Sequence, residues 1–376
     1  MVHFKVNFQY FNSFADITLS LAKTLSELEV PVSVEPSELS PDALKVISDR
    51  ETEMLKSWMQ NSPSELFQLK WSHYWPTTRD IQLQGHINFE WFAINYEFMQ
   101  NNQPFDDWIQ STVRNPYHKL AVSHYCKQVL LKAGCSELQV SVLPLGANPI
   151  LFNQNFLEEQ SSLEKPPQIK RFLHLTNSWD LYRFGTDIFL PIFCEEFQGN
   201  PHVILIIKDG GSNNNQVTEM VKKIRQKMGN TMPSIYIVRR LLTKTDLAKL
   251  YLSSDVLVAP FRGEGFAIKI LDAFAVGLPV IMPLYGGPTE YANSSNCYPI
   301  NYDKIPLGIC YDTQFIQPQN SPHWAEPNPE SLRQQLHHAI HDKNQALIRQ
   351  KAKETAQKFS WDATAKKFIA LMRKLC

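Results

Sequence analysis

The sequence lacks the short motifs that mark several common enzyme classes. No two of its six cysteines form a C-x-x-C pair, and H-E-x-x-H, G-x-S-x-G and G-x-G-x-x-G are all absent. These absences argue against a zinc ribbon, a thioredoxin-like site, a zincin protease, an α/β-hydrolase and a classical dinucleotide site. Six thiols in 376 residues also do not resemble a disulfide scaffold, so we expect reduced, mostly buried cysteines.

An excess of charge and long apolar runs are missing as well. Lys plus Arg and Asp plus Glu both number 37, which leaves no basic excess for binding nucleic acid. The longest aliphatic runs, such as Val203 to Ile207, are far shorter than the roughly 20 residues of a membrane span. The N-terminus has no basic region followed by an apolar run, so no signal peptide is predicted. These features predict a cytoplasmic protein with no transmembrane segment.

What the chain does contain is an alternation of strand and helix patterns with an ordinary apolar content of 43%. In the first half, strands are expected at 2–10, 31–34, 66–71, 86–89, 120–125 and 140–145, and helices at 17–28, 40–60 and 126–134. Ser40 and Pro41 are the expected start of the second helix. The polar stretch 153–170, with Pro166 and Pro167, is typical of a linker.

The second half repeats the alternation more regularly. Strands are expected at 171–175, 202–207, 234–238, 255–259 and 279–283, and helices at 187–197, 217–228, 243–253, 266–276 and 361–376. Successive units of this kind predict an α/β protein built from Rossmann-like, doubly wound domains.

The stretch from Ser254 to Tyr298 is the richest in groups that could bind a ligand. A strand ends at Pro260, a Gly263-Glu264-Gly265 turn follows, and a helix is expected from Phe266. The first N–H groups of that helix would suit a phosphate, and Glu264 and Asp272 would suit a hydroxyl-rich ligand such as a sugar or ribose. The same residues are equally typical of a plain tight turn followed by an exposed aspartate.

The segment FRGEGFAIKILDAFAVGLPVI resembles the donor-site signature of bacterial retaining GT-B glycosyltransferases of the family 4 type, glycosyl transferases group 1. Three further stretches agree in order: VSVLPLGANPILF, RFLHLTNSWDLYRFGTDIFLPIF, and GGPTEYANSSNCYPI followed by WAEPNPESLRQQL. The resemblance extends from Leu120 to the C-terminus. It implies a GT-B architecture, with two Rossmann-like domains facing a cleft. The expected domains are an acceptor-side domain at 1–165, to which a C-terminal helix at 357–376 returns, and a donor domain at 166–356.

The resemblance also implies roles for individual residues. Glu264 matches the acid that contacts the hydroxyls of the donor sugar, and Asp272 stands where the family has an acid that contacts the ribose. Backbone groups around the diphosphate and sugar are implied at Gly263, Gly265, Phe266 and Ala267.

The cations of the family pattern are where this chain departs most. Phe184 stands at the usual lysine position, and its neighbour Arg183 is the first candidate to meet the diphosphate, since a guanidinium suits phosphate. The alternative is that Arg183 is only a surface charge. Lys208, at the end of an apolar strand, is the second candidate, and Arg262 and Lys269 are weaker ones.

The first half contributes weaker candidates on the acceptor side. Glu90, in INFEWFAIN, matches a family segment that lines the cleft, either for acceptor binding or for cleft structure. Asn12 and Ser13 lie in a loop that lacks the glycine of the relatives. His337 and His341, four residues apart on an expected helix, could bind a metal but are more typical of a solvated face.

The resemblance implies a retaining hexosyltransferase that moves a sugar from a nucleoside-diphosphate sugar to a glycan, lipid or protein acceptor. The chain contains no D-x-D, so neither a metal nor a cofactor is expected. No nucleic acid partner is expected, and peripheral contact with a membrane is compatible with the sequence. Two alternatives stay open: a degenerate GT-B module that binds a sugar nucleotide or a partner without turnover, and a GT-B epimerase or phosphorylase.

Overall fold

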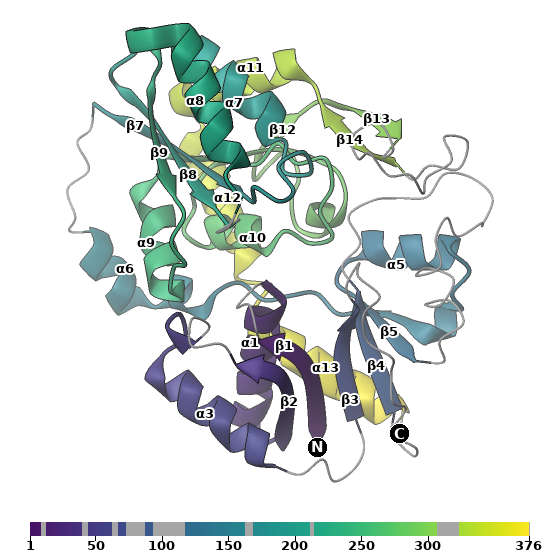
Figure 1. Ribbon diagram of the computed structural model, residues 1–376. Coiled ribbons are helices and arrows are strands. Elements are labelled where there is room, and N and C mark those ends of the chain that lie inside the picture. Colours follow the sequence, from purple (N-terminus) through teal and green to yellow (C-terminus); the bar gives the residue numbers. More distant parts are fainter. Residues whose placement is uncertain are drawn as a thin grey trace. The chain divides into compact units, whose positions relative to one another are not determined.

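The computed structural model describes residues 1–8, 13–39, 44–61, 67–72, 87–92, 117–161, 168–210, 214–306 and 323–375 (Figure 1). These residues divide into two compact units. The first is drawn from 1–146 and 359–376, and the second from 147–314 and 322–358.

The first unit contains a parallel sheet with the strand order β2-β1-β3-β4-β5-β6. Its described elements are β1 (Val2–Phe8), α1 (Ser13–Glu27), β2 (Val32–Leu39), α3 (Asp49–Gln60), β3 (Phe67–Ser72), β4 (Ile87–Phe92), β5 (His118–Ala121), α5 (His124–Lys132), η1 (Glu137–Gln139), β6 (Val140–Val142) and α13 (Trp361–Leu375).

Serine caps set two helix starts in this unit, and they differ from the expected ones. The helix expected from Ser40 begins at Asp49, because Ser48 and Glu51 form a reciprocal capping box; residues 40–43 lie outside the described residues. The strand expected at 120–125 ends at Ala121, because the Ser123 hydroxyl accepts a hydrogen bond from the Cys126 N–H and starts α5.

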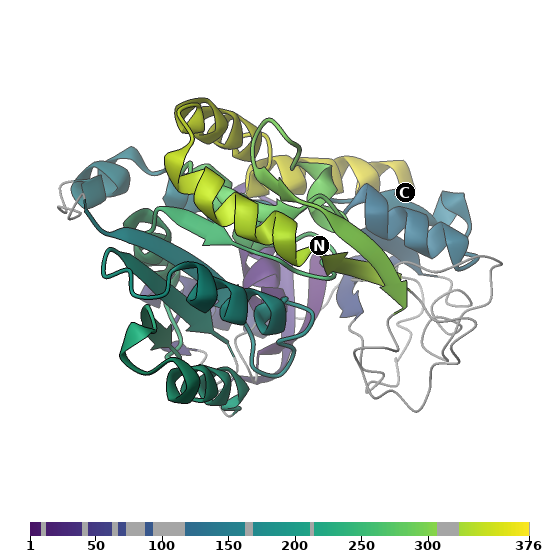
Figure 2. The same cartoon turned by 90° about the horizontal axis from the view of Figure 1, so that it is seen from above.

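The C-terminal helix α13 belongs to the first unit. It packs against α1 (Figure 1), and Figure 2 shows the same yellow helix from above. The Thr364 hydroxyl donates to the Pro144 carbonyl over 2.8 Å. A Cβ atom at Gly146 would lie 2.4 Å from the Trp361 nitrogen. The chain therefore leaves this unit and returns to it along neighbouring paths, with backbone against backbone.

The second unit contains a six-stranded parallel sheet and a small antiparallel pair. Its described elements are η2 (Pro149–Phe152), α6 (Gln154–Ser161), β7 (Lys170–Thr176), α7 (Thr186–Glu196), β8 (Val203–Asp209), α8 (Gln216–Met228), η3 (Gly229–Thr231), β9 (Ser234–Val238), α9 (Lys244–Ser253), β10 (Val256–Val258), α10 (Ile268–Ala275), β11 (Val280–Pro283), η4 (Gly287–Glu290), β12 (Tyr298–Ile300), β13 (Tyr302–Pro306), β14 (His323–Pro327), α11 (Pro329–His341) and α12 (Gln345–Ala356).

The order of the large sheet is β12-β11-β10-β7-β8-β9, which is the doubly wound pattern. The chain builds outward from β7 in one direction as far as β9 and then crosses to β10 and continues the other way. The topological switch point therefore lies between β7 and β10, and the loops that follow these two strands leave the same edge of the sheet. In open α/β sheets this is where ligands bind.

The core of this unit consists of apolar side chains from the sheet and from α7, α8 and α11. Three phenylalanines of this core, Phe172, Phe193 and Phe197, pack ring against ring with centroids 4.9–5.3 Å apart. Buried aromatic pairs of this kind stabilise a core beyond their buried area. The apolar strand patterns of the sequence correspond to this core.

The boundary between the units differs from the one expected at residue 165. The first unit ends at Gly146 and the second begins at Ala147. The reason is a hydrogen bond of 2.7 Å from the Asn148 N–H to the Asp272 carboxylate, which ties the start of η2 to α10. Nor is the expected linker at 153–170 all irregular, since 154–161 form helix α6 and 162–167 lie outside the described residues.

Two expectations concern the whole chain. Among the described residues, no helix is long and apolar enough to cross a membrane. The four described cysteines are buried free thiols, as expected: Cys126, Cys135, Cys194 and Cys297.

Candidate functional site

The loop after β7 is fixed at both ends. At its start, the buried Asp209 carboxylate accepts hydrogen bonds from the Ser178 N–H and hydroxyl over 2.8 and 2.6 Å. At its end, Gly185 has a φ of 67°, and a Cβ there would lie 1.8 Å from the Pro260 carbonyl oxygen. Only glycine allows this approach, so the loops after β7 and β10 pack directly against each other.

The turn after β10 has an unusual backbone. Ala267 is left-handed, with φ 59° and ψ 61°, and caps α10, which begins at Ile268 rather than at the expected Phe266. The segment 286–291 holds this turn from behind. The Gly287 N–H donates to the Glu264 carbonyl over 2.7 Å, and a Cβ at Gly287 would lie 1.7 Å from the Gly265 carbonyl oxygen.

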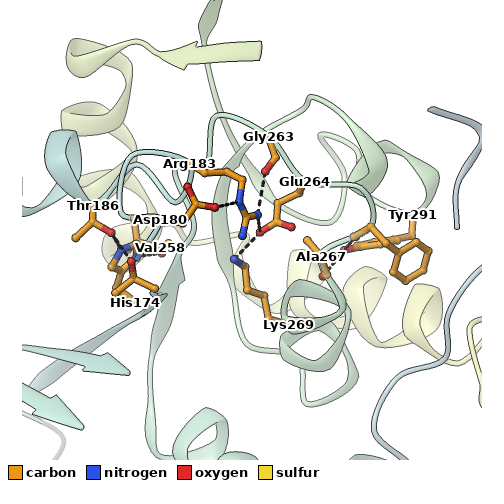
Figure 3. Close-up of polar contacts among 12 residues, drawn as sticks. His174, Asp180, Arg183, Thr186, Val258, Gly263, Glu264, Ala267, Lys269 and Tyr291 are labelled. Carbon is orange, nitrogen blue, oxygen red and sulfur yellow. Dashed lines mark hydrogen bonds and ion pairs between the residues drawn. The ribbon is translucent and has the colours of Figure 1, made fainter. Parts of the chain in front are cut away.

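The two loops bring a cluster of four charges together, which we call the Glu264 cluster: Asp180, Arg183, Glu264 and Lys269 (Figure 3). The buried Glu264 carboxylate lies 2.7 Å from Lys269 Nζ and 3.3 Å from Arg183 Nη1. Arg183 also pairs with Asp180 and donates to the Gly263 carbonyl over 3.3 Å. Two cations therefore meet one carboxylate at the switch point.

Phe184 forms a face of this cluster. The Lys269 Nζ lies 3.8 Å from the centroid of its ring, and the Arg183 Cζ lies 4.2 Å from it. Both cations are thus attracted to the ring as well as to Glu264. Phe184, which stands where the resemblance leads us to expect a lysine, thus contacts two cations. Arg183 comes from the same loop and Lys269 from α10.

The protonation states follow from burial and from these contacts. Burial alone would raise the pKa of Glu264, but Lys269 and Arg183 outweigh it and hold that pKa below its usual value. Burial lowers the pKa of Lys269, and the neighbouring Glu264 carboxylate only partly compensates. The cluster holds an ionised carboxylate beside a lysine whose proton is less tightly bound than usual.

The other candidate cations have different partners. Lys208 Nζ donates to the Asp209 carbonyl over 2.9 Å. Arg262 is buried and forms ion pairs with Asp187 and Glu326, which raise its pKa. Arg262 therefore joins three elements of the fold, and the structure brings Lys269 rather than Lys208 to Glu264.

Asp272 is buried and, as described above, accepts a hydrogen bond from the Asn148 N–H. Gly263, Gly265, Phe266 and Ala267 are all buried in the turn itself. The expected donor-binding residues thus lie in the buried turn and in the helix α10 that follows it.

Of the three candidates of the first half, two lie in elements that the structure describes. Asn12 lies outside the described residues, Ser13 is the first residue of α1, and Glu90 lies in β4. Their side chains are not placed. His337 pairs with Glu196 over 2.8 Å on the surface of α11. Among the described residues no cluster of His, Cys, Asp and Glu could hold a metal ion.

A buried polar network beside the cluster has no counterpart in the sequence patterns. His174 Nδ1 lies 2.8 Å from the Val258 carbonyl and its Nε2 lies 2.9 Å from the Thr186 hydroxyl. Nδ1 must donate to the carbonyl, so Nε2 accepts from Thr186, whose oxygen in turn accepts from Thr176. Burial lowers the pKa of His174 to about 4. This neutral imidazole joins β7, β10 and the start of α7.

Comparisons with known proteins find similarity to glycosyltransferases. Residues 174–302 match the sequence model of the family described as glycosyl transferases group 1. The D-inositol 3-phosphate glycosyltransferase of Saccharomonospora viridis is 26% identical over 129 residues, which are 34% of this chain and 25% of that protein. The curated relatives are matched over a quarter of their own length or less.

Solved structures resemble the whole chain. A glycosyltransferase from Rickettsia africae has a TM-score of 0.68 at 15% identity, over 100% of this chain and 98% of the other. The Anabaena protein HepE, solved in complex with UDP-glucose, has a TM-score of 0.66 at 12% identity, over 99% of both chains. The chain therefore has the GT-B fold of these glycosyltransferases, and its segment 174–302, which contains the Glu264 cluster, matches glycosyl transferases group 1.

Proposed function

We propose that this protein is a retaining, metal-independent glycosyltransferase that moves a sugar from a nucleoside-diphosphate sugar to an acceptor hydroxyl. The observation that carries the proposal is the Glu264 cluster at the switch point of the second sheet, where Arg183 and Lys269 both reach Glu264. The family match to 174–302 and the UDP-glucose complex of the Anabaena neighbour support it.

The chemistry of the transfer explains why cations are needed. The bond from the anomeric carbon to the diphosphate breaks, the acceptor oxygen bonds to that carbon on the same face, and the acceptor proton passes to the leaving phosphate. Negative charge grows on the diphosphate while the sugar gains oxocarbenium character. Fixed donors and cations aimed at such charge typically lower the barrier by about 3–4 kcal/mol each. In our proposal Arg183 and Lys269 supply this charge without a metal ion.

Glu264 is the proposed sugar-orienting residue. An ionised carboxylate accepts hydrogen bonds from two hydroxyls at once, which fixes a sugar ring in one orientation. Asp272 stays the proposed ribose contact, with its orientation set by the Asn148 N–H. The backbone at 263–267 is proposed to surround the diphosphate and the sugar.

The acceptor side remains with the first unit in this proposal. Glu90, Asn12 and Ser13 are its candidate residues, and the acceptor is a glycan, a lipid or a protein. The assignment to the family 4 type, to bacterial enzymes and to hexosyl transfer rests on the sequence resemblance. The cytoplasmic location is proposed from the cysteine content and from the sequence features described above.

One observation favours a second candidate function, a GT-B module that binds a sugar nucleotide without turnover. In this structure Arg183 already pairs with Asp180 and Glu264, and Lys269 with Glu264. A site whose cations stay on their own carboxylates would bind a diphosphate weakly and would not stabilise its departure.

The experiment that separates these functions measures release of nucleoside diphosphate. The protein is incubated with UDP-glucose and with GDP- and ADP-sugars, with a panel of hydroxyl acceptors and with excess EDTA. Turnover that persists in EDTA, and a product with the anomeric configuration of the donor, support the full proposal. Binding of the donor without release of diphosphate supports the second candidate.

Matched variants test the assignment of the cations. Arg183→Met and Lys269→Met should each lower turnover about 10²–10³-fold, the usual effect of losing a donor aimed at developing charge. Lys208 lies at the same edge of the sheet but contacts a different partner, the Asp209 carbonyl. Lys208→Met should therefore lower turnover far less. A larger loss in Lys208→Met than in Lys269→Met would return the role to Lys208.

A further inference from the structure

We propose that Tyr291 is a positioning residue that orients the turn at 264–268 toward the diphosphate. The inference rests on the proposed function and assigns to it a residue that contacts no substrate. Tyr291 follows η4 and lies behind the turn, on the side opposite Arg183 in the close-up (Figure 3).

The side chain of Tyr291 contacts both the turn and the helix that follows it. Its hydroxyl oxygen lies 2.8 Å from the Phe266 carbonyl and 2.8 Å from the Ala267 carbonyl. Its ring packs against Phe266 and Phe274, with centroids 5.3 and 5.8 Å away. The side chain is buried, and burial keeps its pKa well above the usual value, so the hydroxyl stays a donor at any physiological pH. Two successive carbonyls therefore face one hydroxyl group.

The geometry of the peptide bond gives these contacts a consequence. In a trans peptide the C=O of one residue and the N–H of the next point in opposite directions, and the described residues contain no cis peptide. Since the carbonyls of Phe266 and Ala267 face Tyr291, the N–H groups of Ala267 and Ile268 face the other way. Successive N–H groups at such a change of helical sense form a concavity that suits an anion.

This arrangement needs support because it contains strain. A left-handed alanine costs on the order of 1–2 kcal/mol relative to the ordinary helical conformation. The hydroxyl of Tyr291 offsets that cost because its single proton is shared between the Phe266 and Ala267 carbonyls, which flank the strained conformation. The Gly287 N–H donates to the Glu264 carbonyl, two residues before Phe266. The segment 286–291 thus fixes both the turn that carries Glu264 and the first N–H groups before α10.

The test removes the hydroxyl alone. Tyr291→Phe keeps the ring contacts, and Tyr298→Phe is the matched control, because its hydroxyl bonds to Asp342 elsewhere in the unit. UDP and uridine are the probes, with affinities measured by calorimetry and thermal midpoints recorded for each variant. We expect Tyr291→Phe to lower the affinity for UDP about tenfold and the affinity for uridine less than twofold. Tyr298→Phe should leave both affinities unchanged even where it lowers the thermal midpoint.

The outcomes are separable from those of the proposed function. If the parent protein binds none of UDP, GDP and ADP, the proposed function fails and this inference fails with it. If the parent binds UDP, two results overturn only the role of Tyr291. Either Tyr291→Phe binds UDP as tightly as the parent, or it loses affinity for UDP and for uridine to the same extent.

A second pair of variants keeps the inference testable if Tyr291→Phe unfolds. Glycine adopts the left-handed conformation without strain, so Ala267→Gly should make the hydroxyl less necessary. The double variant that carries both Ala267→Gly and Tyr291→Phe should therefore fold. Its affinity for UDP should differ about twofold or less from that of Ala267→Gly alone. A tenfold loss in that background too, or a double variant that still fails to fold, would show that the hydroxyl does not act by holding Ala267.

Discussion

Glu264 is a turn residue in the sequence but a buried ion in the structure. Its side chain accepts two cations, and the same carboxylate is the proposed contact of the donor sugar. Removing one partner of a buried ion network leaves the others uncompensated, which typically costs about 3–5 kcal/mol. A substitution here must therefore affect stability as well as activity.

Glu264→Gln tests both effects. We expect turnover to fall about 10²-fold or more, because the neutral amide orients a sugar less firmly. At pH 7 we expect the free energy of unfolding to fall by about 3 kcal/mol. Without Glu264 the pKa of Lys269 is lowered further, so its folded-state pKa lies below that of the unfolded chain. Stability of the variant should then recover as the pH rises toward the unfolded value.

Chemical denaturation of the parent and of Glu264→Gln at pH 7 and pH 9.5 checks this. The stability gap between them should narrow at the higher pH. A gap that is the same at both pH values would mean that Lys269 is not the uncompensated charge.

His174 gives a second prediction, on stability at acid pH. Burial lowers its pKa from the ordinary 6.5 to about 4 in the folded protein, so the unfolded chain takes up the proton first as the pH falls. This group therefore lowers stability as the pH falls from about 6.5 toward 4. Between pH 7 and pH 4.5 the loss amounts to about 2 kcal/mol.

The check is urea denaturation at these two pH values for the parent and for His174→Asn. The variant is less stable at pH 7 but should lose about 2 kcal/mol less than the parent on acidification. His118, whose pKa burial also lowers to about 4, contributes equally to both proteins and cancels in the comparison.

At this scale the sequence indicated Glu264 and Arg183 but ranked Lys208 above Lys269. The reason is physical. Lys269 is five residues from Glu264, a spacing that brings side chains together in neither a helix nor a strand. Only the left-handed Ala267 between them folds the lysine back onto the carboxylate, and an alanine gives no signal of a positive φ. Tyr291 and His174 act through the backbone and leave no motif.

At the scale of elements, the site depends on the fit between two backbone segments. The chain at 286–287 lies so close to the turn at 264–266 that Gly287 has no room for a side chain. Gly286 has a φ of 70°, and a Cβ atom there would lie 2.8 Å from the Glu264 carbonyl oxygen. Any side chain at these positions moves the turn.

Gly287→Ala should therefore displace the turn. We expect a loss of several kcal/mol in stability, since a Cβ at 1.7 Å from a carbonyl oxygen cannot be accommodated without moving backbone. We also expect UDP binding to weaken at least tenfold. Gly210→Ala is the control, because its Cβ would meet its nearest atom at an ordinary 3.6 Å.

Differential scanning fluorimetry and UDP titration of both variants check this prediction. A Gly287→Ala protein with the stability and UDP affinity of Gly210→Ala would show that the two segments can separate without consequence for the turn.

The elements themselves were predictable where the pattern was local. The strands of the second sheet carry short apolar runs between turn residues, and the expected bounds agree with β7 to β11 within one to two residues. Errors occurred where a polar residue decided the boundary. Ser48 and Ser123 each start a helix by capping it. The cap, rather than the apolar pattern on either side, sets the boundary. Helix α6 was missed because only Phe156 and Leu157 of its eight residues are apolar, too few for a helical apolar pattern.

At the scale of the whole molecule, the sequence indicated two Rossmann-like domains and the GT-B fold, and the solved neighbours confirm that fold. The position of the division was not predictable from composition. A polar, proline-containing stretch is a reasonable linker by composition, but the contact of Asn148 with Asp272 is made between residues far apart in the sequence.

The division into two units predicts that damage to α13 stays in the first unit. Phe368 is fully buried, and Phe368→Ala should cost about 3–5 kcal/mol. Hydrogen exchange should accelerate in α1 and β1, while β7, β8 and α7 keep the protection of the parent. Lys367→Ala, at an exposed position of the same helix, should change neither set.

Equal loss of protection in both units of Phe368→Ala would contradict this prediction. It would show that the protein opens as one cooperative body.

The return of the chain to its first unit also has a consequence for the order in which the protein is made. A ribosome releases residues from the N-terminus onward, so the second unit has all its strands and helices once residue 358 has emerged. The first unit, although synthesised first, must wait for α13 to cover α1 and for Trp361 to reach Gly146. During translation the apolar face of α1 is therefore open to chaperones for as long as the second unit takes to be synthesised.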